Sequence, residues 1–242
     1  MEKHFDQHIS RQFNQELEKL RQDVMAMGGL AEEMVEGSIR AVVEGDSDLA
    51  HRMIELDDRV NTMEKDIDGY CTMILARRQP TASDLRLVLA IIKTVNDLER
   101  IGDEAEKIAK MAIRLIESDR PRNNFRELEN MAQTVRSMLH DALDGFARMV
   151  PEVAVALVRE DEKVDAEYEA ILRQYYTYLV EEPRTTRRVL DCIWIARSLE
   201  RIGDHAKNIG EYIIYLVEGK DLRHASPEEM EKTILQDDRN DS

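Results

Sequence analysis

Cysteine, glycine and aromatic residues are all scarce in this chain of 242 residues. The two cysteines, Cys71 and Cys192, lie far apart and form no Cys-x-x-Cys motif, so we expect neither a disulfide framework nor a zinc site. No glycine-rich phosphate loop and no Gly-x-Ser-x-Gly nucleophile motif occurs. The sequence therefore has none of the common signatures of a nucleotide-binding or hydrolytic site.

Long apolar runs are also absent. The longest one covers only residues 87–92, far short of a membrane span, and the N-terminal residues contain no apolar signal core. The formal net charge of −16 would repel phosphate backbones and anionic lipid. We expect a soluble, cytoplasmic protein that does not bind nucleic acid and does not insert into a membrane.

What the chain has in quantity is helical patterning. Apolar residues recur at intervals of three and four, and no segment alternates like a strand. Short polar, proline or glycine segments interrupt the pattern, as at Gly45-Asp46-Ser47, which is expected to close one helix and cap the next. The pattern predicts six helices, at about residues 8–44, 49–78, 84–117, 125–149, 152–180 and 185–217.

Two local features of these helices leave alternatives open. Gly28-Gly29 interrupts the first helix, either as a weak spot costing up to about 1 kcal/mol per glycine or as a close approach of another helix. Before the third helix, Thr81 or Ser83 is expected to cap the N-terminus.

The sequence Leu-Glu-Arg-Ile-Gly-Asp occurs at residues 98–103 and again at 199–204. This repeat indicates an internal duplication of three helices. We predict an all-α fold with six long antiparallel helices in two tandem three-helix bundles. The expected repeats span 1–120 and 121–224, and residues 225–242 are expected to be an acidic, disordered tail.

In each repeat, acidic residues lie four apart on the second and third helices, and therefore on one face of each helix. Antiparallel packing would bring both helices' acids together, where they repel one another unless a cation lies among them. Oxygen ligands suit Mg²⁺, Ca²⁺, Mn²⁺ or iron. The candidate metal ligands are Asp57, Asn61, Glu99 and Asp103 in the first repeat, and Asp161, Asp165, Glu200 and Asp204 in the second.

A simpler interpretation makes these acids an ordinary solvated helix face, with Arg100 and Arg201 pairing with nearby acids. On either interpretation, Leu98 and Ile101, like their counterparts in the second repeat, are expected to face the core, with the acids pointing away from it. His205 follows Asp204 directly and is expected to have a structural role.

The doubled motif resembles the PhoU family of phosphate-specific transport system accessory proteins. The likeness covers about residues 8–220, with further matching stretches at 27–30, 77–86 and 213–219. It implies a cytoplasmic, non-enzymatic negative regulator of the phosphate regulon and of phosphate uptake, commonly a homodimer. Such a protein would link the ATPase PstB of the phosphate transporter to the sensor histidine kinase PhoR.

The resemblance also implies metal ions or multinuclear metal clusters bound through E/DxxxD motifs. These are Glu99/Asp103, Asp161/Asp165 and Glu200/Asp204, and Asp57/Asn61 departs from the motif. Two alternatives are a carboxylate-bridged di-metal oxidase and a metal-free helical scaffold. The oxidase would need Glu-x-x-His pairs, and none of the six histidines has a Glu three positions before it.

Overall fold

The computed structural model describes residues 2–118, 125–223 and 225–237, without the side chains of residues 2–10. No strand occurs in these ranges, so the predicted all-α class is confirmed. Of the described helices, none has the length and apolar content that crossing a bilayer demands. The elements are α1 (Glu2–Glu44), α2 (Ser47–Arg78), α3 (Ala82–Glu117), α4 (Arg126–Arg148), α5 (Glu152–Glu181), η1 (Pro183–Thr185), α6 (Thr186–Glu218) and α7 (Pro227–Asp237).

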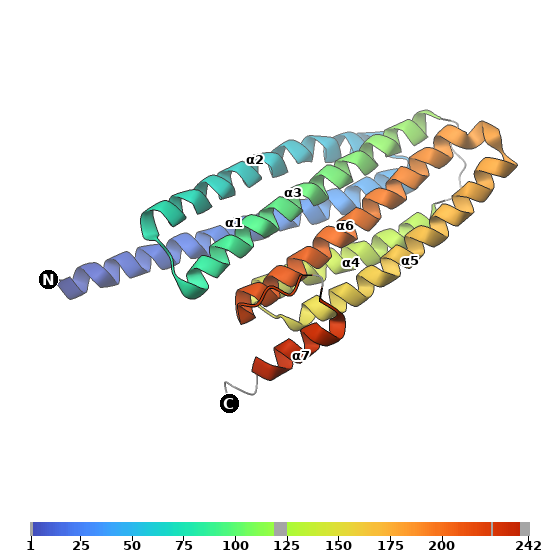
Figure 1. Ribbon diagram of the computed structural model, residues 1–242. Helices are drawn as coiled ribbons and strands as arrows, with labels where there is room; N and C mark the ends of the chain where they lie inside the picture. The colour runs from blue at the N-terminus through green and yellow to red at the C-terminus, as the bar shows by residue number, and fades with distance from the viewer. Residues whose placement is uncertain (1, 119–124, 224, 238–242) are drawn as a thin grey trace.

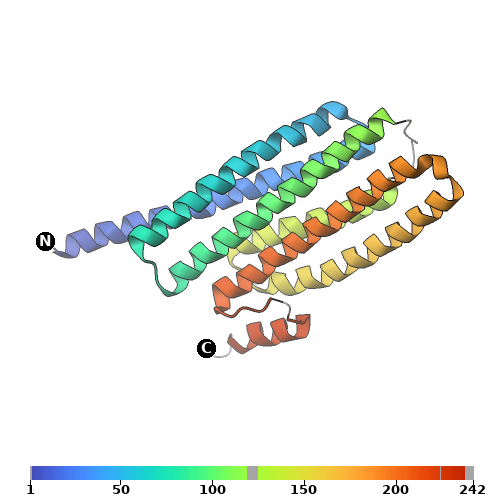
Figure 2. The ribbon, with the colours of Figure 1, turned by 45° about the horizontal axis from the view of Figure 1, so that its top comes forward.

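Two antiparallel three-helix bundles lie side by side, as the duplicated pattern predicts (Figure 1). Helices α1–α3 form one bundle and α4–α6 the other. The turned view shows α3 and α6 running next to each other along the junction between the bundles (Figure 2). Helix α1 also packs against α4, so the two bundles contact each other through two helix pairs, α3 with α6 and α1 with α4.

One hydrophobic core runs through both bundles. Leu98 and Ile101 on α3, and Leu199 and Ile202 on α6, are fully buried in it, as predicted. Burying a side chain of this size contributes about 1.5–3 kcal/mol. Because α3 and α6 are covered by their own bundle on one side and by each other on another, they are the most enclosed helices of the fold.

The predicted cap forms at the start of α2 but not at the start of α3. Gly45 has φ of +73°, and the Asp46 carboxylate accepts a hydrogen bond of 2.9 Å from the backbone N–H of Leu49. At the start of α3, Thr81 is the N-cap residue, as predicted, but its side chain makes no capping hydrogen bond.

The first glycine of the Gly28-Gly29 pair marks a close helix approach. A Cβ atom at Gly28 would lie 2.6 Å from Leu143 Cδ2 on α4, whereas one at Gly29 would meet nothing within 4 Å. Gly28 therefore allows α1 and α4 to pack, which decides between the two interpretations of this pair.

The segment expected to be a disordered tail contains helix α7, so that expectation is wrong over Pro227–Asp237. Met230 and Ile234 are buried against Ala154 and Val155 of α5 and Ile214 of α6. Most of the residues around them are polar or acidic, so the sequence shows no clear amphipathic pattern here. Residues 238–242 lie outside the described ranges.

Candidate metal-binding sites

The glycine of each repeated motif sets the distance between the helices that carry the acids. A Cβ atom at Gly102 would lie 3.3 Å from Val60 Cγ1 and 3.4 Å from Asp57 Oδ1. At Gly203 the equivalent distances, to Val164 Cγ1 and Asp161 Oδ1, are 3.5 and 3.8 Å. The third helix of each bundle therefore crosses the second closely, next to an aspartate.

The first acidic set lies in the groove between α2 and α3. Asp57 is 8% exposed, and its Oδ2 accepts a hydrogen bond of 2.7 Å from Asn61 Nδ2. Its Oδ1 is buried and has no hydrogen-bond partner. Burial raises the pKa of Asp57, and the carboxylates of Glu106 and Asp103 raise it further, against the smaller opposing effect of Asn61.

Glu99 is a second acid of this groove with an unsatisfied oxygen. Its Oε2 is buried without a hydrogen bond, although Arg100 Nε lies 3.4 Å away. Burial and the nearby Asp103 raise the pKa of Glu99, while Arg100 lowers it. Asp103 itself lies 3.4 Å from Arg100 Nη1.

Two further acids that were not among the predicted ligands belong to the first set. Glu106 acts on Asp57, and Glu64 acts on Glu99, since each raises the pKa of its neighbour. Both stand three residues after a predicted ligand, Asp103 and Asn61 respectively, which is the helical spacing that would have indicated them.

The second acidic set lies in the equivalent groove between α5 and α6, and a lysine lies within it. Lys207 Nζ contacts Asp161 Oδ2 and lies 2.9 Å from Asp204 Oδ1. Burial acts to lower the pKa of Lys207, but its hydrogen bonds to Asp161 and Asp204 outweigh this and raise it. Burial raises the pKa of Asp161, and Lys207 opposes that rise.

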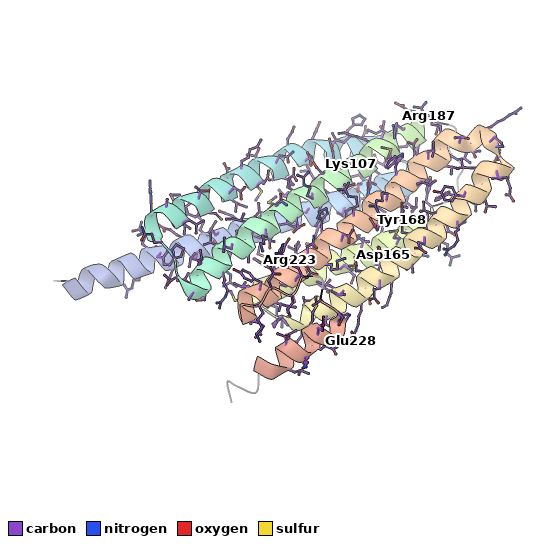
Figure 3. The ribbon with its side chains drawn as sticks, in the orientation of Figure 1. Lys107, Asp165, Tyr168, Arg187, Arg223 and Glu228 are labelled. Atoms are coloured by element: carbon purple, nitrogen blue, oxygen red, sulfur yellow. The ribbon has the colours of Figure 1, made fainter. Side chains whose placement is uncertain are left out.

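Glu200 completes this set from α6 and also has a cationic partner. One of its oxygens pairs with Arg197, while Oε2 is buried without a hydrogen bond. Burial raises the pKa of Glu200, with Arg197 opposing and with Asp204 and Asp165 adding to the rise. Asp165 is exposed on α5, beside α6 (Figure 3).

The predicted orientation of these acids is wrong for Glu99 and Glu200. Their side chains are only 16% and 11% exposed, because a neighbouring helix covers the groove into which they point. Asp57 and Asp161 are buried beneath the same grooves. The solvated-face interpretation therefore fits Asp165 and Asp204, whose side chain is 46% exposed, but not these four buried acids.

The structure gathers each set without assembling a coordination shell. In the part of the chain that the structure describes, no three His, Cys, Asp or Glu side chains are placed to hold one ion together. The buried oxygens of Asp57 and Glu99 that accept no hydrogen bond from the described residues nevertheless fit the donor chemistry of a hard cation. In the second set, the Lys207 ammonium already lies between two of the candidate ligands.

Polar residues that do not belong to either set join α3 to α6. His205 Nδ1 lies 2.7 Å from Asp97 Oδ1, which bears out the structural role expected for His205. At the equivalent positions, Ser198 donates a hydrogen bond of 2.8 Å to Glu104. Arg201, expected to pair with nearby acids, pairs with Glu104 at 2.7 Å.

Neither cysteine belongs to a chemical site. Cys71 and Cys192 are free and buried, and burial raises the pKa of their thiols to about 12 and about 11 respectively. Both are protonated at neutral pH and pack as small apolar groups.

Comparison with known proteins relates both halves of the fold to one family. A model described as "PhoU domain" matches residues 24–112 and again residues 128–213. The chain is 50% identical over 229 residues to the phosphate-specific transport system accessory protein PhoU of Escherichia coli, covering 95% of each chain. It is 49% identical over 227 residues to the PhoU homolog of Pseudomonas aeruginosa, covering 94% of each.

Solved structures show the same arrangement of helices. The crystal structure of PhoU from Pseudomonas aeruginosa superposes with a TM-score of 0.84 at 50% identity, covering 86% of this chain and 100% of the other. That of the phosphate transport system regulatory protein PhoU from Streptococcus pneumoniae gives 0.80 at 29% identity, covering 86% and 98%.

Proposed function

Because this chain belongs to the PhoU domain family, we propose that it is a negative regulator of phosphate uptake and of the phosphate regulon. The observation that carries this proposal is the match of the family model to both helical repeats. Relatives about half identical over nearly the whole chain are named as accessory proteins of the phosphate-specific transport system. The proposed role is to keep uptake and the regulon low when phosphate is plentiful.

The proposal includes an adaptor role in the cytoplasm. The chain would contact the ATPase PstB of the phosphate transporter and the sensor histidine kinase PhoR, and it would act as a homodimer. The relatives' name, which associates them with a transport system, supports the transporter contact.

We propose that the regulator is not an enzyme. The main rival is a di-metal oxidase, which would place histidines among its carboxylates. Here His205 pairs with Asp97 at the α3–α6 junction, and His140 pairs with Glu32 between α4 and α1. Both histidines lie outside the two acidic sets.

Metal binding through the E/DxxxD acids is also part of the proposal. In the first set, Asp57, Glu99 and Asp103 would hold a divalent cation such as Mg²⁺ or Mn²⁺, or iron, with the amide oxygen of Asn61 as a neutral donor. In the second set the corresponding acids are Asp161, Asp165, Glu200 and Asp204. A bound cation would supply the positive charge that relieves the repulsion among these buried acids.

A gene deletion tests the regulatory proposal. In a bacterium carrying a phosphate-responsive reporter, deletion of the gene should derepress the reporter at high phosphate, and expression of this chain should restore repression. Reporter activity that stays low after the deletion would contradict the regulatory proposal. Copurification of the tagged chain with PstB and with PhoR tests the adaptor role, and failure with both partners contradicts it.

Metal analysis separates the metal-binding regulator from a metal-free scaffold. Protein purified without chelator is compared with a Glu99→Ala/Asp103→Ala variant. Metal in the wild type and its loss in the variant support the site. Equal, negligible metal in both removes the site and leaves the regulatory proposal to the reporter experiment.

A further inference from the structure

The two acidic grooves differ at one pair of equivalent positions. Residue 106 on α3 corresponds to residue 207 on α6, three residues after the motif aspartate in each case. The first repeat has Glu106 there and the second has Lys207. The substitution replaces a negative charge by a positive one at the same place in the fold.

We propose that Lys207 is a built-in cation that fills the second acidic set, so that a divalent metal ion binds only to the first set. This inference rests on the proposed metal-binding function and adds to it that one of the two duplicated sites does not take metal. Position 106/207 is the residue that decides which groove is open to an ion.

The contacts of Lys207 place its ammonium where an ion would have to lie. It bridges Asp161 on α5 and Asp204 on α6, the two helices that form the groove. The lysine side chain is only 21% exposed, so the ammonium is held inside the groove. A divalent ion would have to displace it from the oxygens of both aspartates and would still meet its charge nearby.

Arg197 supplies a second cation to this groove, although it leaves Glu200 Oε2 without a hydrogen bond. It pairs with Glu200, and its guanidinium lies 5.8 Å from the ring centre of Tyr168. Tyr168 lies on α5 at the position that Glu64 occupies in the first repeat (Figure 3). At two equivalent positions, therefore, an acid of the first set is replaced by a residue that is not an acid.

The first groove has cations only at its outer edge. Lys110 pairs with Glu106 at 2.5 Å and Arg100 lies near Asp103, but these two side chains are about half exposed, at 51% and 50%. Because neither side chain is part of the core, both can move into solvent. Deeper in the groove, Asp57 Oδ1 and Glu99 Oε2 are buried with no hydrogen-bond partner. Among the described residues, no ammonium lies inside this groove, and Asp57 Oδ1 has neither a hydrogen bond nor an ion pair, whereas Arg100 Nε lies 3.4 Å from Glu99 Oε2.

Titration of metal-free protein with MnCl₂ tests the inference, using calorimetry for stoichiometry and the electron paramagnetic resonance signal of free Mn²⁺ as an independent readout. The wild type should bind one Mn²⁺ per chain. Lys207→Glu, which copies the first repeat, should bind a second, and Lys207→Met should bind a second more weakly. Glu106→Lys, which copies the second repeat, should weaken the wild-type site by about tenfold or more.

Matched controls carry the same change in charge away from the grooves. Lys163 on α5 is exposed and pairs only with Glu160 among the ion pairs of the described residues, so Lys163→Met should leave the stoichiometry at one. Glu129 is exposed on α4, and Glu129→Lys should leave the affinity unchanged. Far-ultraviolet circular dichroism establishes that every variant is folded.

Three results would overturn the inference. The first is two equivalent Mn²⁺ sites in the wild type. The second is a wild-type site that Asp161→Asn abolishes and Asp57→Asn does not. The third is a failure of both Lys207 variants to gain a site. None of these results affects repression of the reporter, so failure of the inference is distinguishable from failure of the regulatory proposal.

Discussion

The two halves of this protein share the core residues of the repeated motif but differ in the charges beside them. Leu98 and Ile101 in α3 and their counterparts in α6 are identical and fully buried. Position 106/207, by contrast, has changed from acid to base between the halves. The side chain at a core position must fill a fixed volume between its neighbours. The side chain at a groove position must instead suit the charges around it.

The two repeats also differ at the junction between the halves, and there the difference allows α3 and α6 to pack together. Asp97 of α3 faces His205 of α6, and the equivalent positions hold Ser198 and Glu104, which also face each other. If both copies had kept acids at these positions, carboxylates would oppose carboxylates in a buried junction. Divergence of the repeats therefore lets α3 and α6 pair as donor and acceptor.

Truncation of the shared core should produce the largest effect and should be equal in the two halves. Leu98→Ala and Leu199→Ala each remove a fully buried side chain, so each should lower the free energy of unfolding by about 2–5 kcal/mol. Denaturant titration measures both. If one substitution proves harmless while the other unfolds the protein, the halves do not contribute equally to one core.

Charge removal at position 106/207 should act in opposite directions in the two halves. In metal-free protein, Lys207→Met leaves the buried Asp161 without its cation, which should cost about 2 kcal/mol. This is below the usual figure for a fully buried pair, because Lys207 retains some exposure to solvent. Glu106→Gln removes a repelling charge from Asp57 and should raise the melting temperature.

Scanning calorimetry with chelator present measures both changes in melting temperature, with Lys163→Met as the control for a lost surface pair. Changes of the same sign at positions 106 and 207 would contradict the contrast between an open groove and a filled one.

The contribution of the first groove to the stability of the fold should depend on pH, because its buried acid Asp57 titrates differently in the folded and unfolded states. The pKa of Asp57 is raised in the folded state, so folding favours the protonated form, and stability from this group falls as pH rises through that pKa. Asp57→Asn mimics the protonated form. In metal-free protein it should therefore raise the melting temperature more at pH 7 than at pH 5, where the wild-type carboxyl is closer to protonated.

Melting curves at the two pH values check this, with Glu129→Gln, at an exposed position of α4 outside the grooves, as the control for loss of a surface carboxylate. A stabilisation by Asp57→Asn that is the same at both pH values would rule out the proposed repulsion.

Substitution of the motif glycines by alanine should change the free energy of unfolding least, and by different amounts at the two positions. Alanine is favoured over glycine inside a helix by up to about 1 kcal/mol. At Gly203 a new Cβ meets its nearest atom at 3.5 Å, so Gly203→Ala should gain part of that energy. At Gly102 the nearest atom is at 3.3 Å, so Gly102→Ala should gain less or nothing. The reverse order in thermal melts would contradict the closer helix approach in the first bundle.

The sequence was sufficient to predict the six long helices and their duplication, because the apolar spacing of each helix is regular and its breaks contain Gly, Pro or capping residues. It did not predict α7. That helix has one narrow apolar face, formed by Met230 and Ile234, among acidic neighbours, and only contact with α5 and α6 explains its burial.

The membership of the acidic sets was partly predictable, but their environment was not. Spacing indicated Asp57 with Glu99 and Asp161 with Glu200, yet burial of these acids depends on how closely α3 and α6 pack on their neighbours at Gly102 and Gly203. The bridge from Lys207 to Asp161 joins residues 46 apart in sequence. No local pattern reveals such a contact.

Anomalous diffraction at the manganese edge, from crystals of the wild-type protein grown with MnCl₂, tests the contrast between the two grooves most directly. The predicted result is an anomalous peak beside Asp57 and Asp103, and none beside Asp161 and Asp204, where Lys207 lies. Peaks of equal height in both grooves, or a peak in the second groove alone, would contradict it.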